Sequence, residues 1–278
     1  MREVFDELER RWVALASGSP RLALSGAGTL GRLRNRLSRR WPSPEQVRAL
    51  FPEMEARAAA RVAWRIGGLE ARNRAWVEGL KRSGLDPLRP LVRTPPAFAA
   101  LRPPLLLVTF HVGAVHALGP ALERLPAAVL GLRHGPFYEV RPPLALETTE
   151  GDAQRRAALF QRLLAHLTGG GFVAMALDIV PGAGLPVPCL GRPLELARGP
   201  FALARLAGVP LVPLVGRWRR EEVEIVLGEA LPPPLAEGAA EWESALAVSA
   251  GLWLERYLRA SPAEIGLGLL RTLLGPEL

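Results

Sequence analysis

Apolar runs and helical patterns alternate along the chain from residue 105 onward. Continuous apolar stretches bounded by Gly or Pro predict buried strands, and apolar residues spaced three or four apart predict helices. We expect strands over residues 105–110, 127–132, 172–177, 209–215 and 222–227. We expect helices over residues 114–125, 152–167, 198–207 and 241–258. This alternation predicts an α/β domain whose mixed, largely parallel central sheet is flanked by helices, with the last of these strands at its edge.

The part of the chain before the first strand has a helical pattern only. Ser43 and Pro44 suit the N-cap and first turn of a helix. Apolar residues at helical spacing then predict one or two long helices over residues 45–81, and they are Val47, Leu50, Met54, Ala58, Val62, Ile66 and Leu69. A proline-rich connector follows. We therefore divide the chain into an N-terminal helical segment, residues 1–82, and an α/β domain, residues 83–278.

The N-terminal segment holds all of the net charge of +8, because it has 17 Lys and Arg against 9 Asp and Glu, whereas the rest of the chain has 18 of each. Six arginines and no acid lie between Arg21 and Pro44. A helix over residues 29–41 is expected there, with a single apolar stripe formed by Leu30, Leu33, Leu37 and Trp41.

A basic helix with one apolar stripe suits an anionic membrane surface, where each basic residue contributes about 1 kcal/mol. We expect this helix to dock on such a surface. The alternative is an ordinary basic helix that packs its leucines on the core. Nucleic acid is not expected as a partner, because tyrosine is scarce and no RNA-binding or zinc-finger motif is present.

Cysteine use and the N-terminal pattern suggest a compartment. Cys189 is the only cysteine, which excludes an intramolecular disulfide and fits a reducing environment. Four of the first seven residues are charged, unlike those of a signal peptide, and the sequence has no run of about 18 apolar residues that could span a bilayer. We therefore expect a cytoplasmic protein, peripheral on the inner face of the cell membrane.

Two predicted strands lead directly to side chains that can transfer protons. The strand over residues 105–110 is followed by His111, with His116 the next polar residue, and the strand over residues 172–177 is followed by Asp178. In open α/β sheets ligands bind beyond the carboxyl ends of the strands, so these side chains belong at one site. Imidazoles with ordinary pKa values near 6.5 suit general base catalysis.

A carboxylate placed straight after six apolar residues is costly to bury unless it is paired. We expect Asp178 to pair with His111, and the alternative is that Asp178 caps a turn at residues 181–182. Gly113 allows backbone or substrate to approach closely. A metal pair of His111 and His116 is not expected, because no cluster with ligand spacing completes it.

A second candidate site is the start of the helix over residues 198–207. Gly199-Pro200 enters the helix, where free backbone N–H groups favour an anion, and Arg198 adds charge there. The alternative is a helix start without a ligand.

The order of motifs resembles the lysophospholipid acyltransferase superfamily, in its branch of lipid A late acyltransferases and phosphatidylinositol mannoside acyltransferases. That branch has an apolar strand ending in His-x4-Asp/Glu, here His111 to His116, and a later strand ending in Asp, here Asp178. The resemblance extends over about residues 45–262. The remaining motifs that carry it are Val187-Pro188-Cys189-Leu190-Gly191, the helix led by Gly199 with Leu203-Ala204, and Gly208-Val209-Pro210-Leu211-Val212-Pro213.

This resemblance implies a glycerolipid acyltransferase-like fold and an acyl transfer reaction. His111 would be the general base that takes a proton from a hydroxyl (or amine) of a lipid or glycolipid acceptor. The acceptor would attack the thioester of an acyl-CoA or acyl carrier protein, and no cofactor besides that donor is implied. Arg133 matches an arginine of the family's substrate cleft, and Arg141 follows it; either is a candidate for holding a phosphate or phosphopantetheine. Gly191 and Gly199 are further candidate substrate-binding positions.

The chain departs from the family at His116, where the pattern has an acid. Three alternatives follow: Asp178 supplies the carboxylate, His116 serves through a hydrogen bond alone, or the chain is an altered homologue that binds a lipid or acyl carrier without catalysis. A hydrolase is a weaker alternative, because the chain has no Gly-x-Ser-x-Gly motif.

Overall fold

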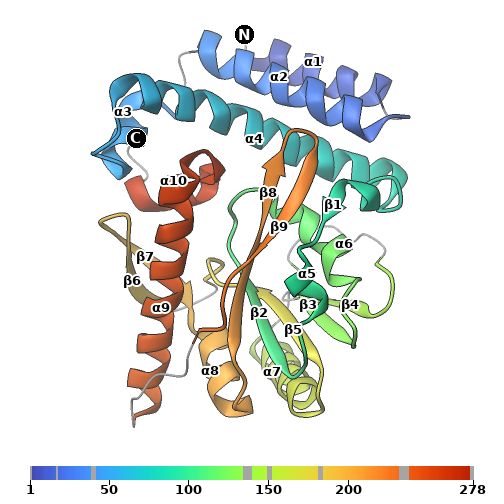
Figure 1. Cartoon of the computed structure of the whole chain (residues 1–278), viewed down its shortest axis with the longest axis vertical. Helices are drawn as coiled ribbons and strands as arrows, with labels where there is room; N and C mark the ends of the chain where they lie inside the picture. Colours follow the sequence, from blue (N-terminus) through green and yellow to red (C-terminus); the bar gives the residue numbers. More distant parts are fainter. Residues whose placement is uncertain are drawn as a thin grey trace.

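The computed structural model describes residues 2–16, 18–38, 42–133, 140–148, 152–180, 184–231 and 238–275. It confirms the predicted fold class: a mostly parallel, curled central sheet is flanked by helices and preceded by a helical segment (Figure 1).

The central sheet has seven strands in the order β1-β9-β8-β2-β5-β3-β4. All neighbouring strands are parallel except β8 and β9, which form a hairpin. The strands are β1 (Val92–Arg93), β2 (Leu105–Thr109), β3 (Val129–Arg133), β4 (Leu144–Thr148), β5 (Phe172–Ala176), β8 (Leu211–Arg219) and β9 (Glu222–Leu227).

The position expected for the strand over residues 222–227 was wrong. This strand, β9, is not at the edge, because β1 pairs with it through Val92 and Arg93. Two residues are too short for periodicity to identify, so β1 left no signal in the sequence. At the opposite edge β4 was also not predicted.

Alternating side chains of β2 face two separate apolar cores. Leu106 and Val108 belong to the core that contains helices α7, α8 and α9, whereas Leu105 and Leu107 belong to the core that contains α5 and α6. Both faces of the sheet are therefore covered, which explains why β2 is apolar at almost every position. The helices are α5 (Pro96–Ala99), α6 (Leu118–Leu122), α7 (Ala153–Thr168), α8 (Arg198–Ala207) and α9 (Ala239–Ala260).

Shorter elements complete this domain. The predicted helix over residues 114–125 is reduced to a 3-10 turn and the five-residue α6. A two-stranded antiparallel hairpin lies beside α9. The remaining elements are η1 (Arg89–Leu91), η2 (Val115–Ala117), β6 (Gly184–Cys189), β7 (Arg192–Ala197), η3 (Pro262–Glu264) and α10 (Leu267–Leu274).

The N-terminal segment forms four helices stacked across one end of the sheet (Figure 1). The long helix α4 passes over the sheet and contributes to both apolar cores. Ser43 caps α3 in a capping box with Gln46, as its position in the sequence predicted. The helices are α1 (Arg2–Leu15), α2 (Pro20–Ser38), α3 (Pro44–Leu50) and α4 (Ala56–Ser83).

The expected helix over residues 29–41 is the second half of α2. Its predicted apolar stripe is not one continuous exposed face: Leu30 is partly buried and Leu33 is 42% exposed. The side chains of Leu37 and Trp41 lie outside the described residues. Along α2 the contact with α4 is instead made by glycines, because a Cβ on Gly31 would lie 2.4 Å from the carbonyl oxygen of Gly67.

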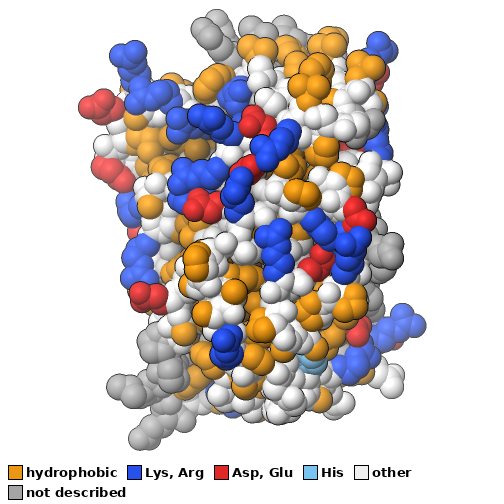
Figure 2. Space-filling model, turned by 45° about the vertical axis from the view of Figure 1, so that its right-hand side comes forward, with side chains coloured by type: hydrophobic (Ala, Val, Ile, Leu, Met, Phe, Trp, Pro, Cys, Tyr) orange, Lys and Arg blue, Asp and Glu red, His pale blue; other side chains and the backbone are white. Residues whose placement is uncertain are grey.

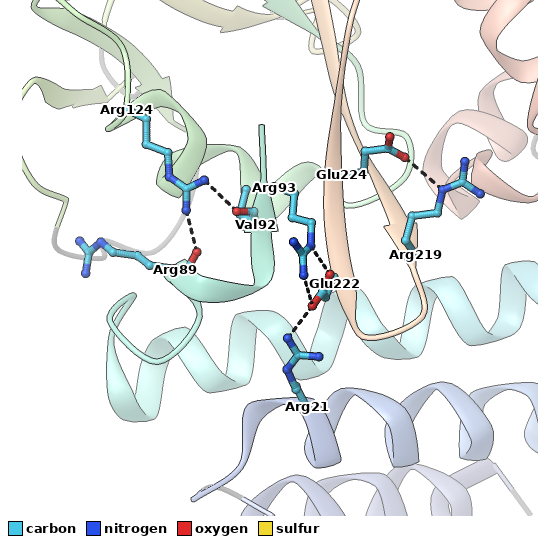
Figure 3. A network of polar contacts seen from close by, with 8 residues as sticks. All are labelled: Arg21, Arg89, Val92, Arg93, Arg124, Arg219, Glu222 and Glu224. Carbon is cyan, nitrogen blue, oxygen red and sulfur yellow. Dashed lines mark hydrogen bonds and ion pairs between the residues drawn. The ribbon is translucent and has the colours of Figure 1, made fainter. Parts of the chain in front are cut away.

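An ion-pair network attaches α2 to the sheet (Figure 3). Glu222, at the β8–β9 turn, accepts hydrogen bonds from Arg21 of α2 at 2.5 Å and from Arg93 of β1, whose Nη2 lies 2.9 Å away. Beside it, Arg124 donates to the carbonyl oxygens of Val92 at 2.8 Å and of Arg89 at 3.0 Å. The two arginines lower the pKa of Glu222 to about 2 by hydrogen bonding and charge.

None of the helices within the described ranges combines the length and the apolar character needed to cross a bilayer.

Candidate active site

Strands β2 and β5 bring His111 and Asp178 together. The strands are parallel neighbours with Thr109 opposite Ala176, so the residues two positions further along are opposite each other as well. His111 Nδ1 lies 2.8 Å from Asp178 Oδ1, and the His111 backbone N–H donates to Asp178 Oδ2 at 2.8 Å. Both carboxylate oxygens are therefore engaged by one residue, which holds the carboxylate and the ring in a fixed mutual orientation.

This arrangement fixes the tautomer of His111. A carboxylate beside Nδ1 requires the proton on Nδ1 and leaves Nε2 as the acceptor, as a general base needs. The side chain of Asp178 is 6% exposed and that of His111 is 38% exposed, so His111 is accessible while Asp178 is shielded. Burial alone would lower the pKa of His111, but the hydrogen bond and charge of Asp178 outweigh it, and the net shift is upward.

The carboxylate beside His111 thus comes from Asp178, which follows the separate strand β5, and not from the position of His116. This was one of the alternatives left open by the sequence. A turn-capping role for Asp178 at residues 181–182 falls on residues outside the described part of the chain.

His116 faces the same cavity as His111. It lies in the 3-10 turn η2, and its backbone carbonyl accepts a hydrogen bond from Trp76 Nε1 of α4 at 3.1 Å. His116 has exposed surface and is among the residues that line the cavity, yet much protein surrounds its side chain. The surrounding protein, together with the charge of His111, lowers the pKa of His116 to about 4. His116 is therefore uncharged at neutral pH and does not oppose the protonation of His111.

The loop between the two histidines is held by elements distant in sequence. Asn73 Nδ2 of α4 donates to the Gly113 carbonyl at 2.9 Å, and Trp218 Nε1 of β8 donates to Asn73 Oδ1 at 3.0 Å. Gly113 adopts φ +57, and a Cβ there would lie 2.0 Å from the Gly216 carbonyl oxygen. The close approach that Gly113 permits is thus to protein backbone. Asn73 was not identified from the sequence, since one polar residue in a helical pattern carries no signal of its contacts.

His111, His116 and Asp178 line a cavity of about 1460 Å³ between the sheet and the N-terminal helices. Its walls come from α1, α2, α4, β7, α10 and the segment after β5. Apolar residues of its lining include Val77, Val115, Ile179 and Leu267. The volume exceeds the ~300–1,000 Å³ of ordinary small-molecule sites and is large enough for an elongated ligand.

Two ion pairs lie in the cavity wall formed by the N-terminal helices. Glu9 of α1 accepts two hydrogen bonds from Arg74 of α4, at 3.0 and 2.8 Å. Arg34 of α2 donates to Asp6 at 2.6 Å. These residues were not predicted to belong to the site, because only the packing of α1 and α2 over α4 brings them there.

The predicted substrate-binding arginines and glycines lie elsewhere. Arg141 pairs with Asp86 at 2.6 Å, and Arg198, at the start of α8, pairs with Glu243 at 2.7 Å. Gly191 occupies the turn between β6 and β7 with φ +70, and Gly199 lies in the first turn of α8. Among the described residues that line the cavity, none of these four is found.

Arg133 and Cys189 complete the set of sequence candidates. Arg133 ends β3, at the same edge of the sheet as Asp178, and its side chain lies outside the described residues. Cys189 is buried in β6 within an apolar core, and burial raises the pKa of its thiol to about 12.

Over the described ranges, no group of three or more His, Cys, Asp or Glu side chains could hold a metal ion. Comparison of the sequence with family models and with curated proteins gives no match.

Proposed function

We propose that the protein is an acyltransferase that moves a fatty acyl group from an acyl-CoA or acyl carrier protein thioester to a hydroxyl (or amine) of a lipid or glycolipid. The observation that carries this proposal is the His111–Asp178 pair at the wall of a large, partly apolar cavity. A histidine with a buried carboxylate on Nδ1 is suited to remove a proton from a hydroxyl through Nε2. The similarity to the lysophospholipid acyltransferase superfamily in the order of motifs supports the same reaction.

The proposed step is a direct transfer. His111 Nε2 takes the acceptor's hydroxyl proton as the oxygen bonds to the thioester carbonyl carbon. The resulting tetrahedral species collapses by breaking the C–S bond, and the proton passes from His111 to the sulfur. The products are an ester and a free thiol. Asp178 stabilises the imidazolium that exists between these two proton transfers.

The first test is a thiol-release assay with acyl-CoA or acyl carrier protein. We expect free thiol only when a lipid acceptor is present, and we expect His111→Ala to abolish the release. Thiol release without acceptor would instead identify a hydrolase. Binding of lipid or acyl carrier without turnover would identify a binding protein.

We also propose that α1 and α2 dock on the anionic inner face of the cell membrane. Val4, Leu8 and Leu15 are exposed by 60%, 46% and 84% and form one stripe along α1. Figure 2 shows hydrophobic side chains at the surface of the end of the molecule where α1 and α2 lie, with Lys and Arg nearby. The opposite side of α1, through Asp6 and Glu9, lines the cavity, so docking would bring the site close to lipid acceptors.

This docking surface is tested by vesicle co-sedimentation. Leu8→Glu together with Leu15→Glu should reduce binding to vesicles of phosphatidylcholine and phosphatidylglycerol, because two apolar anchors become anions. Leu206→Glu and Leu252→Glu, made on exposed leucines of α8 and α9, are the matched control and should leave binding unchanged. Equal binding by both double variants would refute docking through α1.

A further inference from the structure

The proposed reaction needs a hydrogen-bond donor for the oxygen of the thioester carbonyl. That oxygen gains negative charge as the acceptor attacks, and preorganised donors at such an oxygen often supply the largest part of catalysis. Backbone N–H groups of a tight loop beside the base are the usual first candidates, and the loop after β2 is such a loop.

The four consecutive N–H groups that start at His111 are all bonded within the protein. His111 N donates to Asp178 Oδ2 at 2.8 Å. Val112 N donates to the Phe110 carbonyl at 2.8 Å, Gly113 N to the Glu264 carbonyl at 2.7 Å, and Ala114 N to the Gly216 carbonyl at 2.7 Å. This loop therefore offers no free backbone donor between residues 111 and 114.

The ring of His116 is free where those N–H groups are not. Within the part of the chain that the structure describes, no hydrogen bond to its ring nitrogens is found, and His116 lines the same cavity as His111. Its backbone is fixed by the bond from Trp76 to the His116 carbonyl. We propose that the imidazole N–H of His116 donates a hydrogen bond to the thioester carbonyl oxygen and to the oxyanion that this oxygen becomes.

This role rests on the proposed acyl transfer and adds to it the residue that binds the carbonyl oxygen of the donor. An uncharged imidazole always carries one N–H, so the low pKa of His116 keeps a donor in place without placing a positive charge beside the base. An acid at this position would be ionised at neutral pH and would accept hydrogen bonds instead of donating them. The replacement of the family's acid by His116 thus gives residue 116 a different task, while Asp178 holds the base.

The test has a spectroscopic arm that needs no turnover. Palmitoyl-CoA carrying a ¹³C label at its carbonyl is bound to His111→Ala protein, and the infrared stretch of the labelled carbonyl is measured with and without a second change, His116→Leu. A hydrogen bond from His116 should lower the stretching frequency, and His116→Leu should raise it again.

If palmitoyl-CoA binds but both proteins give the same frequency, the donor role is wrong. If it does not bind, the acyl-CoA form of the proposed function fails, and the comparison is made with palmitoyl-acyl carrier protein. Failure to bind either donor would overturn both proposals.

The kinetic arm compares three variants with His111 intact. His116→Leu should lower kcat about 10²–10³-fold, with a much smaller change in KM for the donor. His116→Gln, whose amide can still donate, should stay within about 10-fold of the wild type. His116→Glu should lose as much as His116→Leu, because a carboxylate repels the oxyanion; full activity of His116→Glu would show that residue 116 acts as an acidic partner of the base and would overturn the proposal.

Discussion

At the scale of single residues, the proposed reaction requires the two ring nitrogens of His111 to have different partners. One nitrogen must contact the protein, and the other must be open to the ligand. Asp178 engages Nδ1, and the 38% exposure of the side chain leaves the other nitrogen accessible. The sequence could predict this pair, because each residue directly follows a buried apolar strand. It could not decide between Asp178 and His116 as the partner, since that choice depends on β2 and β5 being neighbours in the sheet.

Replacing Asp178 tests this division of roles. Asp178→Asn removes the charge that raises the pKa of His111 but leaves the burial that lowers it. The proposed reaction needs unprotonated His111, so activity should rise with pH through that pKa, and the acid limb of kcat/KM should move to lower pH in the variant. The plateau of kcat/KM at high pH should fall about 10²–10⁴-fold, because the asparagine would no longer stabilise the tautomer and the imidazolium form of His111.

The matched control is Asp152→Asn, at the N-cap of α7, where asparagine also caps well. It should leave both the plateau and the acid limb unchanged. An unshifted acid limb in Asp178→Asn would show that His111 does not set the pH dependence.

At the scale of elements, the contact between α2 and α4 shapes the cavity wall. This contact is close because it is made by glycines, which have no side chain. Gly31 and Gly67 let the two backbones approach so closely that a Cβ on Gly31 would meet both the Gly67 oxygen and the Ala71 Cβ at 2.4 Å. The helices themselves could be predicted from the spacing of their apolar residues. The way they cross could not, because periodicity identifies the buried face of a helix but not the helix that packs on it.

Gly31→Ala should therefore destabilise the protein. Alanine favours helix by about 1 kcal/mol over glycine, but backbone and Ala71 must separate to admit the methyl group, at a cost of about 1–3 kcal/mol or more. Urea denaturation measures the difference. Gly79→Ala, also within a helix of this segment, is the control: its Cβ would meet only Leu88 methyl groups, at 3.8 and 3.9 Å, and it should be neutral or stabilising. Equal changes in the free energy of unfolding for the two substitutions would mean that the backbones of α2 and α4 lie further apart than in this structure.

At the scale of the whole molecule, one carboxylate joins the helical segment to the sheet. Glu222 bonds Arg21 of α2 and Arg93 of β1, the strand that the sequence did not reveal (Figure 3). The overall α/β class was predictable from alternating patterns, but this connection was not, because a single charged residue in an arginine-rich chain has many possible partners.

The link should be visible in the pH dependence of stability. The pKa of Glu222 is about 2 in the folded protein, below the ordinary value near 4.3. The contribution of Glu222 to the free energy of unfolding is therefore fully present above about pH 5, and it is lost as the pH falls toward 2. Glu222→Gln should lower the melting temperature at pH 7, and its difference from the wild type should vanish near pH 2.

Salt should also reduce that difference, since exposed pairs are screened. Glu229→Gln, on an exposed carboxylate that follows β9, is the control and should show no comparable pH-dependent difference. A difference for Glu222→Gln that persists undiminished to pH 2 would indicate that it arises from something other than ionisation.

The hydrogen bond from Gly113 to the carbonyl of Glu264 has a consequence for how the protein is made. A ribosome completes β2, the histidine loop and Asp178 long before it adds residue 264, and Leu267 then donates to Glu70 of α4 at 2.8 Å. During that interval the nascent chain has His111 and Asp178 but lacks the support that shapes the loop between the histidines. If the proposed function holds, acyl transfer is therefore expected to begin only after residues 264–274 have been synthesised and have docked.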